Sequence, residues 1–398
     1  MDSAADAAGE VFDGRPQEKS PRFDAGCEHP PESLWAGLQP DALGVVLRLL
    51  PCSADRARVR SVCRHWRAAA RGHGVPPPLP LLVLPKFRFS CLSPGGALIS
   101  ARCAWMPQEV SDDHARCLGS SDGWLVGVRQ ADDECFLVNA FSHEVVHLPR
   151  LSASDYSCSI CSLRRVVLSA SPESGSKCIV AAFAFRGSKP ELALWKPGMT
   201  SWHVCQDALI AGHIDIAFYQ GKLYMVWRFT PCLFALELGE DEHGVNVSLV
   251  KDCLIERLLP NPLERNGVLS CNIVVWRGKL LLIIRYYGGS QARDNIRKVE
   301  VFALDFSTNP YGLTEIHGFG SDCVFVGSGG CKSFPAGLHG GVEGDLIYFV
   351  PDDYNPHGTF VYNMRDGTVR PFAIESSPRN IGAPEGNLDF PVWLFPSE

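Results

Sequence analysis

A unit of about fifty residues recurs along most of this chain, and it limits the possible folds more than any other sequence feature. Each copy has a turn glycine followed by an apolar strand. Clear copies begin at Gly123, Gly221, Gly278 and Gly344, with a weaker copy at Gly175, so successive glycines are 52, 46, 57 and 66 residues apart. The glycines predict positive-φ turns between consecutive strands. Repeats of this length, with three or four short strands each, are typical of propeller blades of the kelch type.

A second, alternating strand follows each clear copy and ends at a polar residue: Asn139, Glu237, Asp305 or Asn363. These residues follow the glycine by 16, 16, 27 and 19 positions, and we interpret the longest spacing as containing a polar loop at 288–298. At roughly fifty residues per blade, 90–395 predicts six blades, give or take one. The apolar segment 390–395 predicts a strand that completes a blade from the far end of the domain. A large β-sandwich or two separate β domains is the alternative.

Residues 33–73 have helical periodicity instead. Apolar residues fall at the i, i+3, i+4 and i+7 positions of one face, and the same spacing returns after a break at Pro51. The first set is Leu43, Val46, Leu47 and Leu50, and the second is Val59, Val62, Cys63, Trp66 and Ala70. Short helices of this kind bury little surface alone. Because the rest of the chain reads as strands, we expect their neighbour to be another protein.

The helical segment resembles an F-box. The elements that carry the resemblance are Leu38-Gln39-Pro40-Asp41-Ala42-Leu43, Leu50-Pro51 and Val62-Cys63-Arg64-His65-Trp66-Arg67. One residue is inserted before Pro40, and Ala42 replaces a larger apolar residue. The resemblance implies docking to the Skp adaptor of a cullin–RING (SCF) ubiquitin ligase. The residues expected to bind it are Leu38, Pro40, Leu43, Val46, Leu47, Leu50, Val59, Val62, Cys63 and Trp66. The alternative is an ordinary helical cap packed on the following domain.

The C-terminal region resembles the kelch-like domain of unknown function, number 295, that plants fuse to F-boxes. Segments that carry this likeness include 122–125, 138–142, 215–224, 322–327, 344–349 and 391–397. The double-glycine motif of kelch repeats is absent, so the resemblance supports a propeller by analogy. The predicted fold class is therefore α+β and multidomain, with a small helical F-box followed by an all-β propeller-like domain of about six blades.

Composition and charge narrow the partners. Residues 1–32 are polar and acidic, which predicts a disordered tail, and 74–78 is a proline-rich linker before the domain at 79–398. Residues 33–73 carry seven Arg against two Asp, a net charge of +5 in a chain of −7. Because these arginines interleave with the apolar face, an acidic protein partner is favoured over nucleic acid.

The expected location is the cytoplasm, the nucleus or both. No apolar run approaches the roughly 18 residues that cross a membrane. The first residues lack the basic and apolar regions of a secretory signal. The 16 cysteines are irregularly spaced, and we interpret them as free, mostly buried thiols.

Motifs that suggest chemistry have simpler structural interpretations. Gly119–Gly123 matches Gly-x-Ser-x-Gly, but a strand follows where a nucleophile elbow needs a helix, so we predict a blade turn. In 327–333, Cys331 occupies the position of the glycine that precedes Lys in a phosphate-binding loop. The single Cys-x-x-Cys at 158–161 lacks the four ligands of a structural zinc site. We therefore expect no catalytic residues, no metal and no cofactor.

The leading hypothesis is a substrate receptor that docks the Skp adaptor and presents a target protein for ubiquitin transfer. Two polar stretches are the candidate target-binding loops, with Arg293 and Asp294 in the first and Asp352, Asp353 and Tyr354 in the second. One alternative is an F-box scaffold that acts outside the ligase. Another is a propeller enzyme or small-ligand sensor that uses the central channel.

Overall fold

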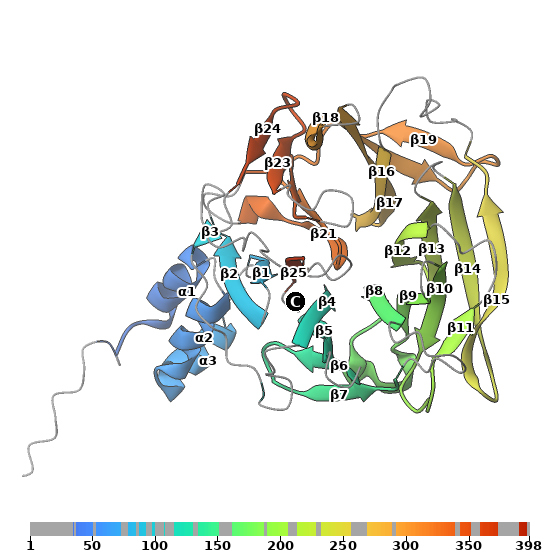
Figure 1. Ribbon diagram of the computed structural model, residues 1–398. Helices are drawn as coiled ribbons and strands as arrows, with labels where there is room; N and C mark the ends of the chain where they lie inside the picture. Colours follow the sequence, from blue (N-terminus) through green and yellow to red (C-terminus); the bar gives the residue numbers. More distant parts are fainter. Residues whose placement is uncertain are drawn as a thin grey trace, which may run out of the picture.

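Helices and strands occupy separate stretches of the chain in the computed structural model (Figure 1). The structure describes residues 35, 37–50, 53–72, 79–84, 87–92, 98–99, 107, 115–129, 134–150, 161–186, 189–205, 213–227, 232–255, 269–288, 292–338, 343–351, 359–372 and 390–395. The predicted tail at 1–32, the linker at 74–78 and the stretch 352–354 lie outside these residues. Three short helices come first: α1 (Pro40–Leu49), α2 (Ser53–Ser61) and α3 (Arg64–Gly72). None of the helices in the described part of the chain is long and apolar enough to cross a membrane.

The strands that follow form six sheets, which are the six predicted blades. Blade 1 contains β25 (Val392–Leu394), β1 (Leu81–Leu84), β2 (Arg88–Leu92) and β3 (Leu98–Ile99). Blade 2 contains β4 (Ala115–Ser121), β5 (Trp124–Arg129), β6 (Glu134–Asn139) and β7 (Val145–Leu148). Blade 3 contains β8 (Cys161–Leu168), β9 (Val180–Arg186), β10 (Lys189–Trp195) and β11 (His203–Cys205).

Blades 4 and 5 contain the longest strands. Blade 4 contains β12 (His213–Tyr219), β13 (Lys222–Trp227), β14 (Leu233–Asp241) and β15 (Gly244–Cys253). Blade 5 contains β16 (Leu269–Trp276), β17 (Lys279–Gly288), β18 (Ala292–Asp305) and β19 (Gly312–Glu315). Blade 6 contains β20 (Cys323–Gly327), β21 (Gly330–Phe334), β22 (Leu346–Phe349), β23 (Phe360–Asn363) and β24 (Val369–Pro371).

The hydrophobic core is divided among the gaps between blades. Six apolar clusters each combine residues of two neighbouring blades, and together they follow the ring. The inner strands β25, β4, β8, β12, β16 and β21 surround the centre in Figure 1. Each blade therefore buries both of its faces, and the residues at the centre come from strands far apart in the sequence.

The ring closes through the end of the chain, as the sequence predicted. Strand β25 pairs antiparallel with β1, in the register Leu81↔Leu394 and Val83↔Val392. The indole of Trp393 is almost fully buried, and its Nε1 donates a hydrogen bond to the Val326 carbonyl oxygen at 3.3 Å. The C-terminal strand thus joins blade 1 to blade 6.

Three of the four clear repeat glycines lie in the predicted turns. The dipeptides Asp122-Gly123, Gln220-Gly221 and Arg277-Gly278 have positive φ at both residues and join consecutive antiparallel strands. This is the two-residue hairpin turn that matches the twist of a sheet. The weak copy differs, because Gly175 (φ 61°) lies in a 3₁₀ segment, η2 (Pro172–Lys177), between β8 and β9.

The prediction for Gly344 is wrong, because positive φ occurs at Asp345 instead. In blade 6 the hairpin is β20–β21, and β22 returns beside β20 in parallel, so Gly344 lies in the longer connection before β22. A Cβ at Gly344 would collide with the Gly320 carbonyl oxygen. Glycine is needed here for a close backbone approach.

The interpretation of 288–298 as a polar loop is also wrong. Most of this stretch extends the β17–β18 hairpin, with Tyr287 paired to Ile296 and Gly288 paired to Ala292. Register shifts on both sides of Tyr287 accommodate the added residues. The long repeat spacing therefore reflects longer strands.

Candidate functional site

The helical module, residues 35–72, has a small core of its own. Leu43 and Leu47 of α1 are buried against Ala69 and Ala70 of α3. Leu38, Val59 and Trp66 pack around this core and are partly buried. Leu43 and Leu47 therefore form the internal face of the module in this structure, and the adaptor contact predicted for them stays a prediction. The spacing correctly predicted a helix, and the apolar face it marks includes the residues that pack against α3.

The Cys-Arg-x-Trp segment also has an internal role. The Cys63 sulfur accepts a hydrogen bond from the Trp66 backbone N–H at 3.4 Å, which caps the start of α3. The Trp66 indole Nε1 donates to the Trp35 carbonyl oxygen at 2.9 Å, so α3 holds the chain that leads into α1. Cys63 and Trp66 thus stabilise the module through internal hydrogen bonds, in addition to any contact with a partner.

The opposite side of α1 is apolar as well. Val45, Val46 and Leu49 are exposed, Leu49 to 73% of its surface. At 100° per residue Val45 and Leu49 face away from Leu43 and Leu47, and Val46 lies at the edge between the two faces. Helices that are apolar on all sides are normally buried. This outer stripe (Val45, Val46 and Leu49) therefore needs a covering group that the described residues do not supply.

The ten predicted adaptor-binding residues divide by exposure. Pro40, Val46 and Val62 are exposed; Leu38, Leu50, Val59, Cys63 and Trp66 are half-buried; and Leu43 and Leu47 are buried. Three further exposed apolar residues, Trp35, Val45 and Leu49, were missed. The i, i+4 spacing of Val45 and Leu49 was a signal for a second apolar face. The face of Leu43 and Leu47 by itself accounts for the periodicity, so the sequence alone does not single out this second face.

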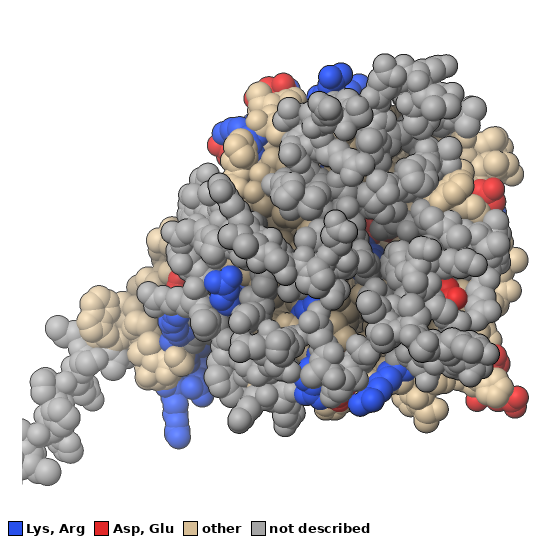
Figure 2. All heavy atoms as spheres, in the orientation of Figure 1, with Lys and Arg blue, Asp and Glu red and all other residues tan. Residues whose placement is uncertain are grey.

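Arginines surround the exposed apolar residues of the module. Of its seven, six are exposed: Arg48, Arg58, Arg60, Arg64, Arg67 and Arg71. Figure 2 shows blue side chains gathered over the part of the molecule where Figure 1 labels the helices. An apolar stripe with a basic surround suits a partner with acidic residues around an apolar patch.

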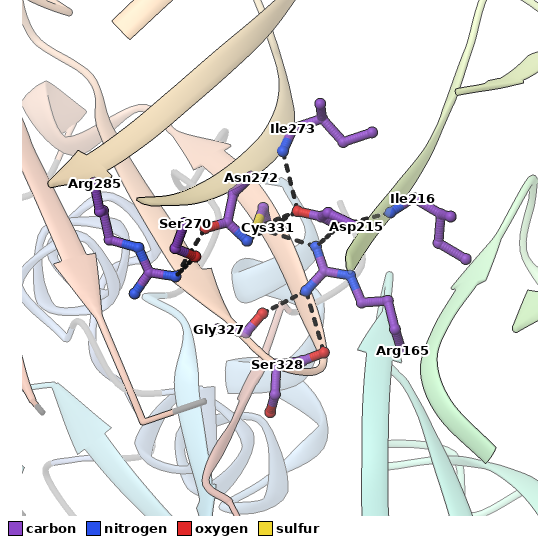
Figure 3. Close-up of polar contacts among 10 residues, drawn as sticks. All are labelled: Arg165, Asp215, Ile216, Ser270, Asn272, Ile273, Arg285, Gly327, Ser328 and Cys331. Atoms are coloured by element: carbon purple, nitrogen blue, oxygen red, sulfur yellow. Dashed lines mark hydrogen bonds and ion pairs between the residues drawn. The ribbon is translucent and has the colours of Figure 1, made fainter. Parts of the chain in front are cut away.

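A second polar cluster lies at the centre of the propeller (Figure 3). Arg165 on β8 forms an ion pair with Asp215 on β12, and both side chains are almost fully buried, at 6% and 0% exposure. Strands β8 and β12 carry irregularities at 164–166 and 213–215, and Arg165 has a positive φ of 44°. Bulges re-aim side chains, and here they turn both charged groups toward the centre.

Asp215 has a full set of hydrogen-bond donors. Its carboxylate accepts from its neighbour, the Ile216 backbone N–H, at 2.7 Å. The Ile273 N–H and the Asn272 amide, both on β16, each donate at 3.0 Å. Burial acts to raise the pKa of Asp215, while Arg165 and these donors favour the charged form. The carboxylate thereby joins blades 3, 4 and 5.

Arg165 reaches across the ring to blade 6. Its guanidinium donates to the Gly327 carbonyl oxygen, to the Ser328 carbonyl oxygen at 3.1 Å and to the Cys331 sulfur at 3.2 Å. Burial works against its charge, but attraction to Asp215 and Cys331 leaves the pKa of Arg165 raised. A cation from blade 3 is therefore held by backbone carbonyls of the opposite blade.

The β20–β21 turn lies at the centre of the ring, beside the Arg165 guanidinium. It contains 327–330, and Gly329 lies so close to β4 that a Cβ on it would be 2.8 Å from the Gly119 Cα. The Ser120 N–H donates to the Gly329 carbonyl oxygen at 3.3 Å. The stretch with a weak likeness to a phosphate-binding loop is thus a hairpin turn that joins blades 2, 3 and 6. Gly119–Gly123 is likewise the predicted blade turn.

Burial makes several of the described thiols poor nucleophiles. Burial raises the pKa of Cys331 to about 11, that of Cys178 to about 11 and that of Cys117 to about 12. The eleven cysteines whose side chains the structure describes are free thiols, five of them buried and six partly exposed. Within the described ranges, no three His, Cys, Asp or Glu side chains gather as a metal site requires.

The predicted target-binding residues are only partly placed. Arg293 and Asp294 lie in β18, in the extended part of the β17–β18 hairpin. Asp352, Asp353 and Tyr354 lie outside the described residues. The role of these five residues stays a prediction.

Comparison with known proteins places the propeller in a family. The family model described as the KIB1-4 beta-propeller matches residues 99–363, about two thirds of the chain. An F-box/kelch-repeat protein from Arabidopsis thaliana is 25% identical over 346 residues, which cover 84% of this chain and 88% of that protein. That match spans more than the propeller alone.

Solved structures show only distant similarity. The N-terminal domain of Nup159 has a TM-score of 0.30 and 8% identity, over 58% of this chain and 60% of that one. Apo AztD from Citrobacter koseri has a TM-score of 0.31 and 8% identity, over 72% and 68% of the two chains. Scores this low carry no functional argument. On the family match, the chain is a member of the KIB1-4 beta-propeller family.

Proposed function

We propose that this protein is the substrate-recognition adaptor of an SCF-type cullin–RING ubiquitin ligase. The helical module docks a Skp-type adaptor, and the propeller presents a target protein. The observation that carries the proposal is the outer stripe of α1, three exposed apolar side chains on a module whose own core is already complete. The similarity to an F-box/kelch-repeat protein supports the same reading.

The chain acts without catalysis of its own in this proposal. It supplies proximity, which raises the effective concentration of target lysines near the charged ubiquitin-conjugating enzyme. The buried Arg165–Asp215 pair and the raised thiol pKa values favour a structural role for the polar groups at the centre. The turn at 327–330 occupies the centre at this level, which disfavours a channel-bound substrate or sensed ligand.

Co-purification of the full chain with a plant Skp-type adaptor tests the docking surface. Val46→Asp/Leu49→Asp places two charges on the outer stripe without touching the buried Leu43 and Leu47, so it should abolish co-purification. The matched control is Leu249→Asp/Leu254→Asp, two exposed leucines five residues apart in and just after β15 of blade 4, which should bind as the wild type does. Normal binding by the α1 variant would refute the assigned surface.

A second measurement separates the ligase role from an F-box scaffold outside the ligase. Proteins captured by proximity labelling with the proteasome inhibited should include a target whose lifetime lengthens when the chain is removed. The α1 variant should capture the same target and leave its lifetime long. If target lifetime does not change in either case, the scaffold alternative is favoured.

A further inference from the structure

Exposed apolar side chains are concentrated on the helical module. Of the nine large apolar residues that are exposed in the described part of the chain, five lie between positions 35 and 62. They are Trp35, Val45, Val46, Leu49 and Val62, and Trp35 is 69% exposed. Apolar patches of this kind promote association in water unless something covers them. A protein awaiting its partner therefore gains from a temporary cover.

The chain itself contains a segment of matching chemistry directly before the module. Residues 1–32 carry eight Asp and Glu against three Lys and Arg, a net charge of −5, and the module carries +5. Within this segment, Val11 and Phe12 stand between Glu10 and Asp13. An apolar pair flanked by carboxylates complements an apolar stripe flanked by arginines.

The segment is attached where it can reach the stripe. The structure describes the chain from Trp35, whose carbonyl oxygen is held by the Trp66 indole of α3. The 21 residues between Asp13 and Trp35 would span about 25 Å if they behaved as a random coil, whereas a ten-residue helix is only about 15 Å long. Short tethers of this kind give effective concentrations in the millimolar range. Even a contact with a dissociation constant of about 0.1 mM would then be mostly formed.

We propose that the acidic N-terminal segment, through 10–13, covers the outer stripe and its arginines in the free protein. The contact is a self-inhibitory one, because a partner that uses the same stripe must displace it. Its effect on the Skp-type adaptor rests on the proposed function, whereas the intramolecular contact does not. At an effective concentration of about 1 mM and a dissociation constant of about 0.1 mM, the cover weakens partner binding about tenfold.

Photo-crosslinking in the full chain tests the contact directly. Phe12→p-benzoylphenylalanine keeps an aromatic side chain, and irradiation should join it to residues 42–64 of the same molecule. Glu10→Gln/Asp13→Asn in this background, or 0.5 M salt, should lower the yield several-fold because charge attraction is removed or screened. Asp2→Asn/Asp6→Asn makes the same charge change farther from Phe12, so it is the matched control and should lower the yield much less.

The products decide between the possible occupants of the stripe. Crosslinks on the propeller, crosslinks between two copies of the chain, or no crosslinks would each overturn the proposal. In a separate binding assay, Phe12→Ser should tighten Skp-type adaptor binding by about two- to tenfold. If the crosslink forms as expected and no adaptor binds any variant, the proposed function fails and the cover stands. If adaptor binds but the crosslink is missing, the reverse holds.

Discussion

Arg165 and Asp215 show how single side chains determine the centre of the ring. Arg165 and Asp215 are 50 residues apart in sequence. Each lies at a register shift of its strand, which the sequence pattern does not reveal. Burial makes both charges costly on their own, so their value depends on pairing and on the groups that hydrogen-bond to each of them. In the sequence, Asp215 stands out only as the first residue of the segment 215–224. Its partner could not be predicted, because the contact depends on the closure of six blades.

Removing the buried cation should cost much of the stability of the propeller. Arg165→Met leaves Asp215 fully buried without its cation, and should lower the free energy of unfolding by about 3–5 kcal/mol, measured by urea titration with tryptophan fluorescence. The comparison is Lys222→Met, whose partner Glu237 is 43% exposed and should matter far less. Arg165→Met/Asp215→Leu should recover part of the loss. Equal urea midpoints for the two single variants would contradict this account.

Asp322 gives the propeller a stability that depends on pH. Burial acts to raise its pKa, but hydrogen bonds from Arg277 at 2.6 Å and Trp276 at 2.8 Å outweigh it and hold the pKa below its ordinary value of 3.8. A lowered folded-state pKa stabilises above the unfolded value and is lost as pH falls through the folded one. Asp322→Asn should therefore destabilise the protein at pH 7 and much less at pH 2.5. An equal loss at both values would exclude this cause.

At the scale of strands and turns, the repeat glycines were the most informative residues. They predicted the hairpins of blades 2, 4 and 5, because turn geometry is local and only a few residues tolerate it. Blade 6 could not be predicted this way. Its parallel pairing of β20 with β22 depends on where the β20–β21 hairpin packs at the centre, which is a contact between distant segments.

Gly278 and Gly344 should respond differently to the same substitution. At Gly278 a Cβ would meet nothing within 4 Å, so only φ (73°) is strained. Gly278→Ala should cost about 1–2 kcal/mol, and Gly278→Asn less, because Asn tolerates this conformation. At Gly344 both substitutions should be severe, because the Cβ would collide with the Gly320 carbonyl oxygen. Thermal unfolding of the four variants measures this, and rescue of position 344 by Asn would contradict the explanation.

In α1, as in blade 6, contacts between distant segments could not be predicted from the local sequence pattern. Periodicity located the helix, since apolar spacing is a property of one element. It could not tell which of two apolar faces is internal, because that depends on α3, where the small residues Ala69 and Ala70 admit Leu43 and Leu47. Of the predicted α1 face, Leu43 and Leu47 form the core of the module while Val46 is exposed, and the exposed Val45 and Leu49 had to be seen in the structure.

For the whole molecule, closure by the last strand is the feature most open to test. Deleting 388–398 removes β25, the only partner of β1 on its inner side, and uncovers the cluster shared by blades 1 and 6. Apolar clusters of this size stabilise through area removed from water, so the truncated protein should melt at a clearly lower temperature or become insoluble. Trp393→Ala should be a milder version of the same loss, about 3–5 kcal/mol. A truncated protein that melts like the intact one would contradict closure by β25.

The central claim is that the helical module binds the adaptor while the propeller stays available to a target. Hydrogen–deuterium exchange of the full chain, with and without a saturating Skp-type adaptor, measures both halves of this claim at once. We predict slower exchange within 40–72, and unchanged exchange in the strands of all six blades. Protection that appears on the propeller, or adaptor binding that leaves α1 unprotected, would contradict the account.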